Sequence, residues 1–150
     1  MPTIETPRLG KIVYKKADVV TFVRPILGFG QISHYVTVSR PDSEPFKWLQ
    51  STEDPSVGFA ILDPRLVMPN YTVEVSAHDI RQLNGTESDE DYRVFGIVSI
   101  PRGHPEQMSI NLQAPIITNT KNLKAVQLVL SYPGYSIRHS ILKNTETSQH

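Results

Sequence analysis

Turn-forming residues divide this chain into short segments, and that limits what it can fold into. The sequence contains 12 prolines and eight glycines in 150 residues. Proline cannot donate a backbone hydrogen bond, so it interrupts the interior of both helices and strands. The segments between these breaks are rich in Val, Ile, Thr, Tyr and Phe. Such a pattern predicts roughly nine short strands and an all-β fold, mainly a small antiparallel β-barrel-like domain with one short helix.

Alternation of apolar and polar residues places the strands. We expect them at residues 11–14, 19–23, 34–38, 46–50, 57–62, 71–75, 92–100, 108–113, 115–119 and 125–130. The first two are separated by the polar segment Lys15-Lys16-Ala17-Asp18, which is the spacing of a hairpin. Residues 135–142 are expected to be ordered after the last of these strands.

One stretch has the features of a helix. Ser76 is a suitable N-cap, and Asp79 follows three residues later. Ile80 and Leu83 would lie on one face of this helix. The Asn84-Gly85 pair predicts a left-handed turn that ends it.

The length of the chain suits one domain. We expect a single β domain over residues 1–142 and a flexible, polar C-terminal tail over residues 143–150. The N-terminus lacks the features of a signal peptide, and no apolar run approaches the ~18–20 residues of a membrane helix. The chain has no cysteine, which fits a reducing compartment. These observations predict a cytoplasmic protein.

The charge balance argues against two classes of partner. Lys and Arg together number 15, as do Asp and Glu, so the net charge is zero. Direct binding of nucleic acid or of an anionic membrane surface favours a basic excess. We therefore expect neither nucleic acid nor membrane as a direct partner.

Motifs for catalysis, metal binding and cofactor binding are missing from the sequence. There is no G-x-S-x-G elbow, and Gly28-Phe29-Gly30 lacks the third glycine of a dinucleotide fingerprint. None of the histidines lies within five residues of another, whereas metal-binding motifs usually pair them locally; they are His34, His78, His104, His139 and His150. We predict no enzyme activity, no catalytic residue, no metal and no cofactor.

An acidic segment follows the expected helix. Glu87, Asp89, Glu90 and Asp91 stand within five residues of one another. They create a local negative field that would steer association with a basic partner. The alternative is a mobile loop that only keeps the protein soluble.

Three stretches of the chain form a combination of motifs. The first is PFKWLQS at residues 45–51, followed by FAILDP at residues 59–64. The second is MSINLQAPIITNTK at residues 108–121, and the third is GYSIRH at residues 134–139. In this order they resemble the family of the flagellar assembly factor FliW. Two features depart from the family pattern: Pro25-Ile26-Leu27 precedes the Gly28-Phe29 pair, and the acidic segment is additional.

The resemblance implies a mechanism of partner exchange. Proteins of this family bind the translational regulator CsrA and antagonise its binding to messenger RNA. They also bind flagellin in the cytoplasm, which couples flagellin synthesis to export. The implied partners are therefore CsrA and flagellin, and the implied fold is a small antiparallel β-barrel.

We predict the partner-binding residues from their positions in the motifs and from their residue types. They are Asn111, Pro115, Asn119, Tyr132, Tyr135, Arg138, Glu87, Asp89 and Asp91. Pro115 would interrupt a sheet edge where a partner strand docks, and tyrosines are common in binding hot spots. For Asn111 and Asn119 the alternative is that they satisfy buried backbone groups in bends.

A second hypothesis comes from another functional class. The chain would then be a small β-barrel metabolite-binding protein or enzyme whose lumen holds the ligand. This hypothesis expects His34, His78 and His139 to converge inside the barrel.

Overall fold

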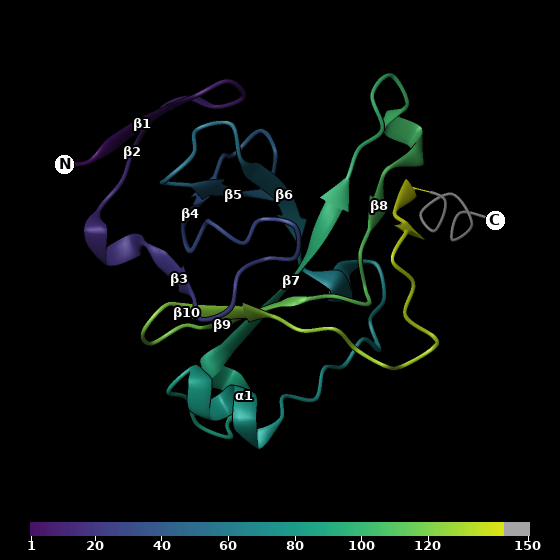
Figure 1. Ribbon diagram of the computed structural model, residues 1–150. Helices are drawn as coiled ribbons and strands as arrows, with labels where there is room; N and C mark the ends of the chain where they lie inside the picture. Colours follow the sequence, from purple (N-terminus) through teal and green to yellow (C-terminus); the bar gives the residue numbers. More distant parts are fainter. Residues whose placement is uncertain (143–150) are drawn as a thin grey trace.

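The computed structural model describes residues 1–142, and this part of the chain is mainly β (Figure 1). Its strands are β1 (Thr3–Thr6), β2 (Gly10–Val13), β3 (Val20–Phe22), β4 (His34–Ser39), β5 (Lys47–Ser51), β6 (Gly58–Leu62), β7 (Tyr92–Ser99), β8 (Ser109–Ile110), β9 (Ile116–Asn119), β10 (Lys124–Gln127) and β11 (His139–Ser140). The helical elements are α1 (Ala77–Gln82) and 3-10 turns at Lys16–Asp18, Pro64–Leu66, Asp89–Asp91 and Pro105–Gln107. The expected tail at residues 143–150 lies outside the described residues. No helix in the described part is long and apolar enough to cross a membrane.

Seven strands close into a barrel in the order β7, β6, β5, β4, β3, β10 and β9, and β9 returns to β7. The eight-residue strand β7 makes this closure possible because it pairs with different partners along its length. Its first half pairs with β9, and its second half pairs with β6 and β8. β11 pairs with the outer side of β8. The predicted all-β barrel with one short helix is confirmed.

One pair of neighbouring barrel strands departs from the antiparallel pattern. β3 and β10 run parallel, with Thr21 opposite Lys124 and Phe22 opposite Ala125. All other strand pairs in residues 1–142 are antiparallel. Strands that are distant in sequence have no hairpin to impose antiparallel order, so barrel closure decides their direction.

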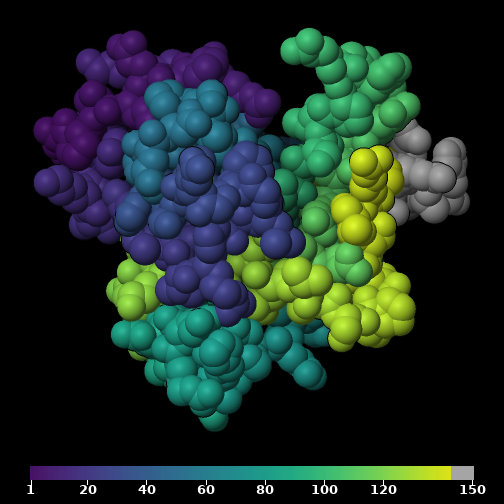
Figure 2. All heavy atoms as spheres, viewed as in Figure 1, coloured from purple at the N-terminus to yellow at the C-terminus, as the bar shows by residue number. Residues whose placement is uncertain are grey.

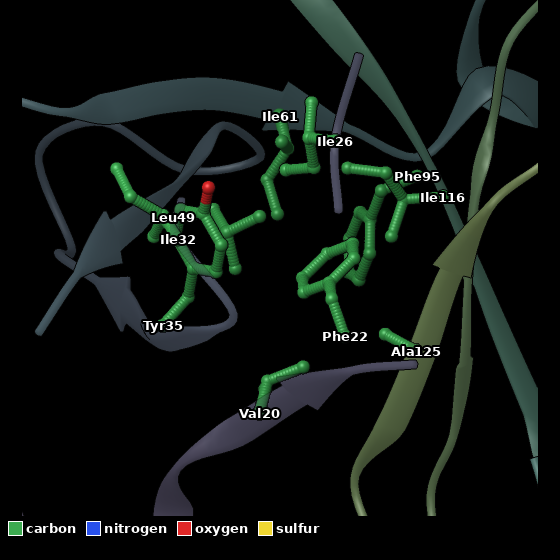
Figure 3. Close-up of a cluster of buried hydrophobic side chains, with 10 residues drawn as sticks. All are labelled: Val20, Phe22, Ile26, Ile32, Tyr35, Leu49, Ile61, Phe95, Ile116 and Ala125. Carbon is green, nitrogen blue, oxygen red and sulfur yellow. The ribbon is translucent and has the colours of Figure 1, made fainter. Parts of the chain in front are cut away.

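Apolar side chains fill the interior of the barrel and point toward one another (Figure 3). They belong to Val20, Phe22, Ile26, Ile32, Tyr35, Leu49, Ile61, Phe95, Ile116 and Ala125. The Phe22 and Tyr35 rings meet edge to face at 5.1 Å. The Tyr35 hydroxyl is buried without a hydrogen-bond partner in the described residues, and burial raises the pKa of Tyr35 to about 12.

The short helix α1 begins and ends as expected. The Ser76 hydroxyl accepts a hydrogen bond from the Asp79 amide at 3.1 Å. Asn84 has a φ of +48° and ends the helix in the left-handed region. Leu83, fully buried at this end, packs with Ile117 of β9 and Val126 of β10, so α1 covers the outer face of these strands.

Two expectations about strands are wrong. Residues 11–14 do not form a hairpin with residues 19–23. Instead β2 pairs with β1 at the N-terminus, where Ile4 lies opposite Ile12 and both are buried. Residues 71–75 are not part of any sheet. Two other expected strands, at residues 108–113 and 125–130, are shorter in the structure.

Candidate partner-binding surface

Two segments outside the sheets, residues 71–75 and 128–132, contribute residues to the lining of a groove on the surface. The groove has a volume of about 580 Å³. Its walls include Thr72 and Glu74 from the first segment, and Val129, Ser131 and Tyr132 from the second. We call it the tyrosine groove, because Tyr132 and Tyr135 line it.

Residues 128–132 carry unpaired backbone groups in the wall of the groove. The amides of Leu128 and Leu130 donate to the carbonyls of Pro115 and Gln113 at 2.9 and 2.8 Å. In an extended chain successive backbone groups point in opposite directions. The backbone groups of Val129 and Ser131 therefore point away from this ladder, and they make no hydrogen bond within residues 1–142.

The opposite wall, formed by residues 71–75, also has backbone groups without hydrogen-bond partners in the described residues. Val73 and Val75 turn their side chains toward the core, whereas Thr72 and Glu74 are exposed. The Thr72 amide donates to the Tyr135 hydroxyl at 3.0 Å. The backbone groups of residues 73–75 make no hydrogen bond in the described part of the chain. This segment thus has the alternation of a strand and lacks a partner strand.

Three tyrosine rings, tilted against one another, pack at one end of the groove. Tyr135 lies between Tyr71 and Tyr132, with ring centroids 4.5 and 4.6 Å away. The buried Tyr71 hydroxyl donates to the Leu112 carbonyl at 2.6 Å, and burial raises its pKa. Tyr132 is 58% exposed, and its ring lies so close to Gly134 that a Cβ there would be 2.4 Å from a ring carbon. Because these contacts hold the exposed Tyr132 ring in place before a partner binds, less side-chain entropy is lost on binding.

Asn111 and Asn119, which the sequence predicts as partner-binding residues, use their side chains to hydrogen-bond backbone groups of this chain. The Asn111 Oδ1 accepts hydrogen bonds from the amides of Gln113 and Ala114, both at 3.0 Å. Asn119 is 2% exposed; its Nδ2 donates to the Leu83 carbonyl and its Oδ1 accepts from the Lys121 amide. These contacts are the structural role that the sequence left open as the alternative.

Pro115 does not lie at an exposed sheet edge, so that expectation is wrong. It is buried directly before β9, and β9 is paired on one side with β7 and on the other with β10. The Pro115 carbonyl accepts the Leu128 amide, which places residues 128–132 beside the barrel. Pro115 therefore helps to position residues 128–132, which form one wall of the groove.

Arg138 is exposed but lies away from the tyrosine groove. It lines a separate depression beside β8 and β11, together with Ser99 and Glu106. The structure therefore brings Tyr132 and Tyr135 together and leaves Arg138 on another part of the surface.

The acidic segment lies beyond α1, in the region that protrudes at the base of the molecule (teal in Figure 2). Glu87, Asp89 and Glu90 are exposed. The Asp91 carboxylate instead accepts a hydrogen bond from the Thr86 hydroxyl and pairs with the Lys121 ammonium at 3.3 Å. The Thr86 hydrogen bond and the Lys121 charge lower the pKa of Asp91. The free negative field thus comes from the first three residues.

The histidines do not converge inside the barrel. His34 is exposed, with its Nδ1 2.9 Å from the Glu53 carboxylate. His78 lies on α1 and His139 on β11. The barrel interior is apolar, and no group of three or more His, Cys, Asp or Glu in residues 1–142 is placed to hold a metal.

The fold and the surface define a class: a small closed β-barrel with an apolar interior and strand-like segments left unpaired outside it. Comparison with known proteins identifies the family to which this barrel belongs. The family model described as FliW protein matches residues 3–141. The chain therefore belongs to the FliW family.

Relatives and a solved structure agree with this assignment. A flagellar assembly factor FliW from Thermosipho africanus is 38% identical over 134 residues, covering 89% of this chain and 92% of the relative. Another from Bdellovibrio bacteriovorus is 38% identical and covers 92% of this chain and 78% of the relative. A crystal structure of the flagellar assembly factor FliW superposes with a TM-score of 0.85 at 27% identity, covering 93% of this chain and 96% of that one.

Proposed function

We propose that this protein is a cytoplasmic flagellar assembly factor that works by binding CsrA and flagellin and that transforms no substrate. When it holds CsrA, messenger RNA is released from that regulator. When flagellin accumulates, flagellin takes the protein, and the freed CsrA lowers flagellin synthesis. The relatives support this proposal because they carry the name flagellar assembly factor FliW. The structural observation that supports binding is the tyrosine groove, which offers a surface for a partner chain.

The tyrosine groove is proposed to bind an extended segment of flagellin. Unpaired amides and carbonyls on both walls match the needs of an added strand, which gains main-chain hydrogen bonds on each side. The exposed Tyr132 ring and the Val129 side chain, 66% exposed, offer apolar contact next to that backbone. Main-chain bonds would supply affinity, and the tyrosine would supply a hot spot.

The acidic segment is proposed to steer CsrA. The chain has no net charge, so a cluster of exposed carboxylates is its main source of attraction for a basic RNA-binding regulator. Steering raises the association rate and is weakened by salt. α1 connects the groove segment at residues 71–75 to the acidic segment, so the two surfaces are neighbours in sequence across one short helix.

Calorimetry with flagellin tests the role of the groove. Ser131→Pro removes an unpaired amide from the wall of the groove, whereas Ser131→Ala keeps it and serves as the matched control. We expect the proline variant to weaken flagellin binding about tenfold or more. The alanine variant should bind as the parent does. Equal affinities of the two variants, with both still folded, would remove flagellin from the groove.

Stopped-flow association with CsrA tests the acidic segment. Reversal of charge at Glu87 and Asp89 to lysine should slow association at low salt and have little effect at high salt. Reversal at the exposed Glu5 and Asp42 changes the net charge equally at other positions and is the control. Identical rates for both double variants would show that the acidic segment does not steer. Lack of binding to either CsrA or flagellin by the parent protein would refute the function as a whole.

A further inference from the structure

One end of the barrel has a polar layer where the rest of the interior is apolar. Along β4 the positions on the cavity side run from the buried Tyr35 to Thr37 and Ser39, which are exposed. Along β9 they run from the buried Ile116 to the half-buried Thr118. Lys47 stands opposite Ser39 in the register of β4 and β5. Polar side chains thus occupy the last positions on the cavity side of these strands, at the mouth of the barrel.

The mouth holds a cavity of about 320 Å³. Side chains from β3, β4, β5, β6, β7 and β9 line it, so it belongs to the closed barrel as a whole. Its floor is apolar and includes Leu49, Ile61, Phe95 and Ile116 of the core. A volume near 300 Å³ is at the small end of the range for small-molecule sites.

Two cations stand at the rim, and no carboxylate lines the cavity. Arg93 lies opposite Thr118, and its guanidinium covers the Phe95 ring at 4.9 Å. No carboxylate in residues 1–142 forms an ion pair with Arg93. The Lys47 ammonium lies 3.0 Å from the Ser39 hydroxyl and 3.2 Å from the Glu44 carboxylate.

We propose that the barrel mouth binds a small carboxylate that carries a short apolar tail. Arg93 presents a fork of donors that fits a carboxylate, and the Thr118 hydroxyl beside it is a further donor. The tail enters the cavity and contacts Leu49, Phe95 and the other apolar floor residues. This chemistry is found in a free short-chain fatty acid and in the apolar C-terminal residue of a peptide. The site is independent of the tyrosine groove.

Titration followed by NMR chemical shifts tests the site with four probes. Hexanoate represents the free acid, N-acetyl-leucine represents a chain terminus, and hexylamine and N-acetyl-leucinamide are the matched compounds without a carboxylate. We expect saturable shifts at the Leu49 and Thr118 amides with one or both carboxylates at millimolar concentration, about 1–10 mM. Tighter binding of hexanoate identifies a free acid as the source, and tighter binding of N-acetyl-leucine identifies a chain terminus.

Variants separate the site from unspecific binding. Arg93→Gln should weaken carboxylate binding about tenfold, and Thr118→Val, which removes a hydroxyl from the mouth, should weaken it less. Arg102→Gln, at an exposed arginine outside the cavity, should bind as the parent does. The proposal is overturned if neither carboxylate gives saturable shifts or if the amine and amide probes bind equally well. It is also overturned if both folded mouth variants keep parental affinity. Flagellin binding by the same variants should be unchanged, so failure here is distinguishable from failure of the proposed function.

Discussion

The barrel and the tyrosine groove are built from the same kind of chain, yet they satisfy their backbones in opposite ways. Strand β9 has a hydrogen-bonded neighbour on each side. Residues 73–75 and Val129 lie in segments whose side chains alternate in burial as those of a strand do, and their backbone groups make no hydrogen bond within residues 1–142. An unpaired strand is a template for another chain. In the barrel, each strand is paired on both sides, and this pairing stabilises the fold. In the tyrosine groove, backbone groups without partners remain available to bind another chain.

The largest expected effect separates core from surface. Ile61→Ala removes a side chain that is 1% exposed in the barrel interior. We expect it to lower the free energy of unfolding by about 2–5 kcal/mol, from lost burial and the cavity left behind. Leu66→Ala, at a side chain 59% exposed, should change it by less than about 0.5 kcal/mol. Urea denaturation of both variants measures the contrast, and similar losses would contradict the assignment of the core.

Asn119 connects the barrel to the end of α1, and its removal should have the next largest effect. Asn119→Ala leaves the Lys121 amide without its acceptor and takes one donor from the Leu83 carbonyl. The expected loss is about 1–3 kcal/mol. Asn122→Ala is the control, because it removes the equivalent two contacts, with the Leu83 carbonyl and the Lys124 amide, at a side chain that is exposed. If the two variants lose equally in thermal or urea unfolding, Asn119 has no special structural role.

A matched pair of tyrosines tests the two kinds of buried hydroxyl. The Tyr35 hydroxyl has no partner in the described residues, so Tyr35→Phe should raise the free energy of unfolding by about 1 kcal/mol. The Tyr71 hydroxyl donates to Leu112, so Tyr71→Phe should lower it by about 1 kcal/mol. Opposite signs are the prediction, measured in the same urea series. A loss for Tyr35→Phe would mean that its hydroxyl has a hydrogen bond.

The smallest effect concerns the pH dependence of the acidic segment. The pKa of Asp91 is lowered in the folded state, so its carboxylate stabilises the fold above the unfolded pKa of about 4. That stabilisation is lost as the pH falls through the lowered folded pKa. Asp91→Asn should therefore destabilise the protein at neutral pH, and the difference should shrink in acid. Unfolding curves of the parent and the variant at several pH values test this. If the stability difference between the two proteins does not change with pH, ionisation of Asp91 does not stabilise the fold.

Local chemistry made part of this structure predictable. Ser76 and Asn84 set the ends of α1 through interactions within the same short stretch, so the sequence is sufficient to place them. Alternation identifies an extended segment, but it carries no information about the partner strand. This is why the sequence predicts the wrong partner for residues 11–14, and a strand at residues 71–75, which pair with no sheet.

The candidate site was predictable only in part, for the same reason. Tyr132 and Tyr135 stand out in sequence as residue types suited to binding. Their neighbour Tyr71 comes from a distant segment, and a contact between residues so far apart in sequence depends on the closed fold. Arg93 and Lys47 also looked like ordinary strand residues, because the barrel mouth exists only once seven strands have closed.

Hydrogen–deuterium exchange with and without flagellin tests the central claim most directly. In the free protein the amides of residues 73–75 and of Val129 and Ser131 should exchange quickly, whereas β9 amides are protected. Addition of flagellin should slow exchange on both walls of the groove and leave the barrel strands unchanged. Protection that appears elsewhere, with the groove amides still exchanging as in the free protein, would contradict the account.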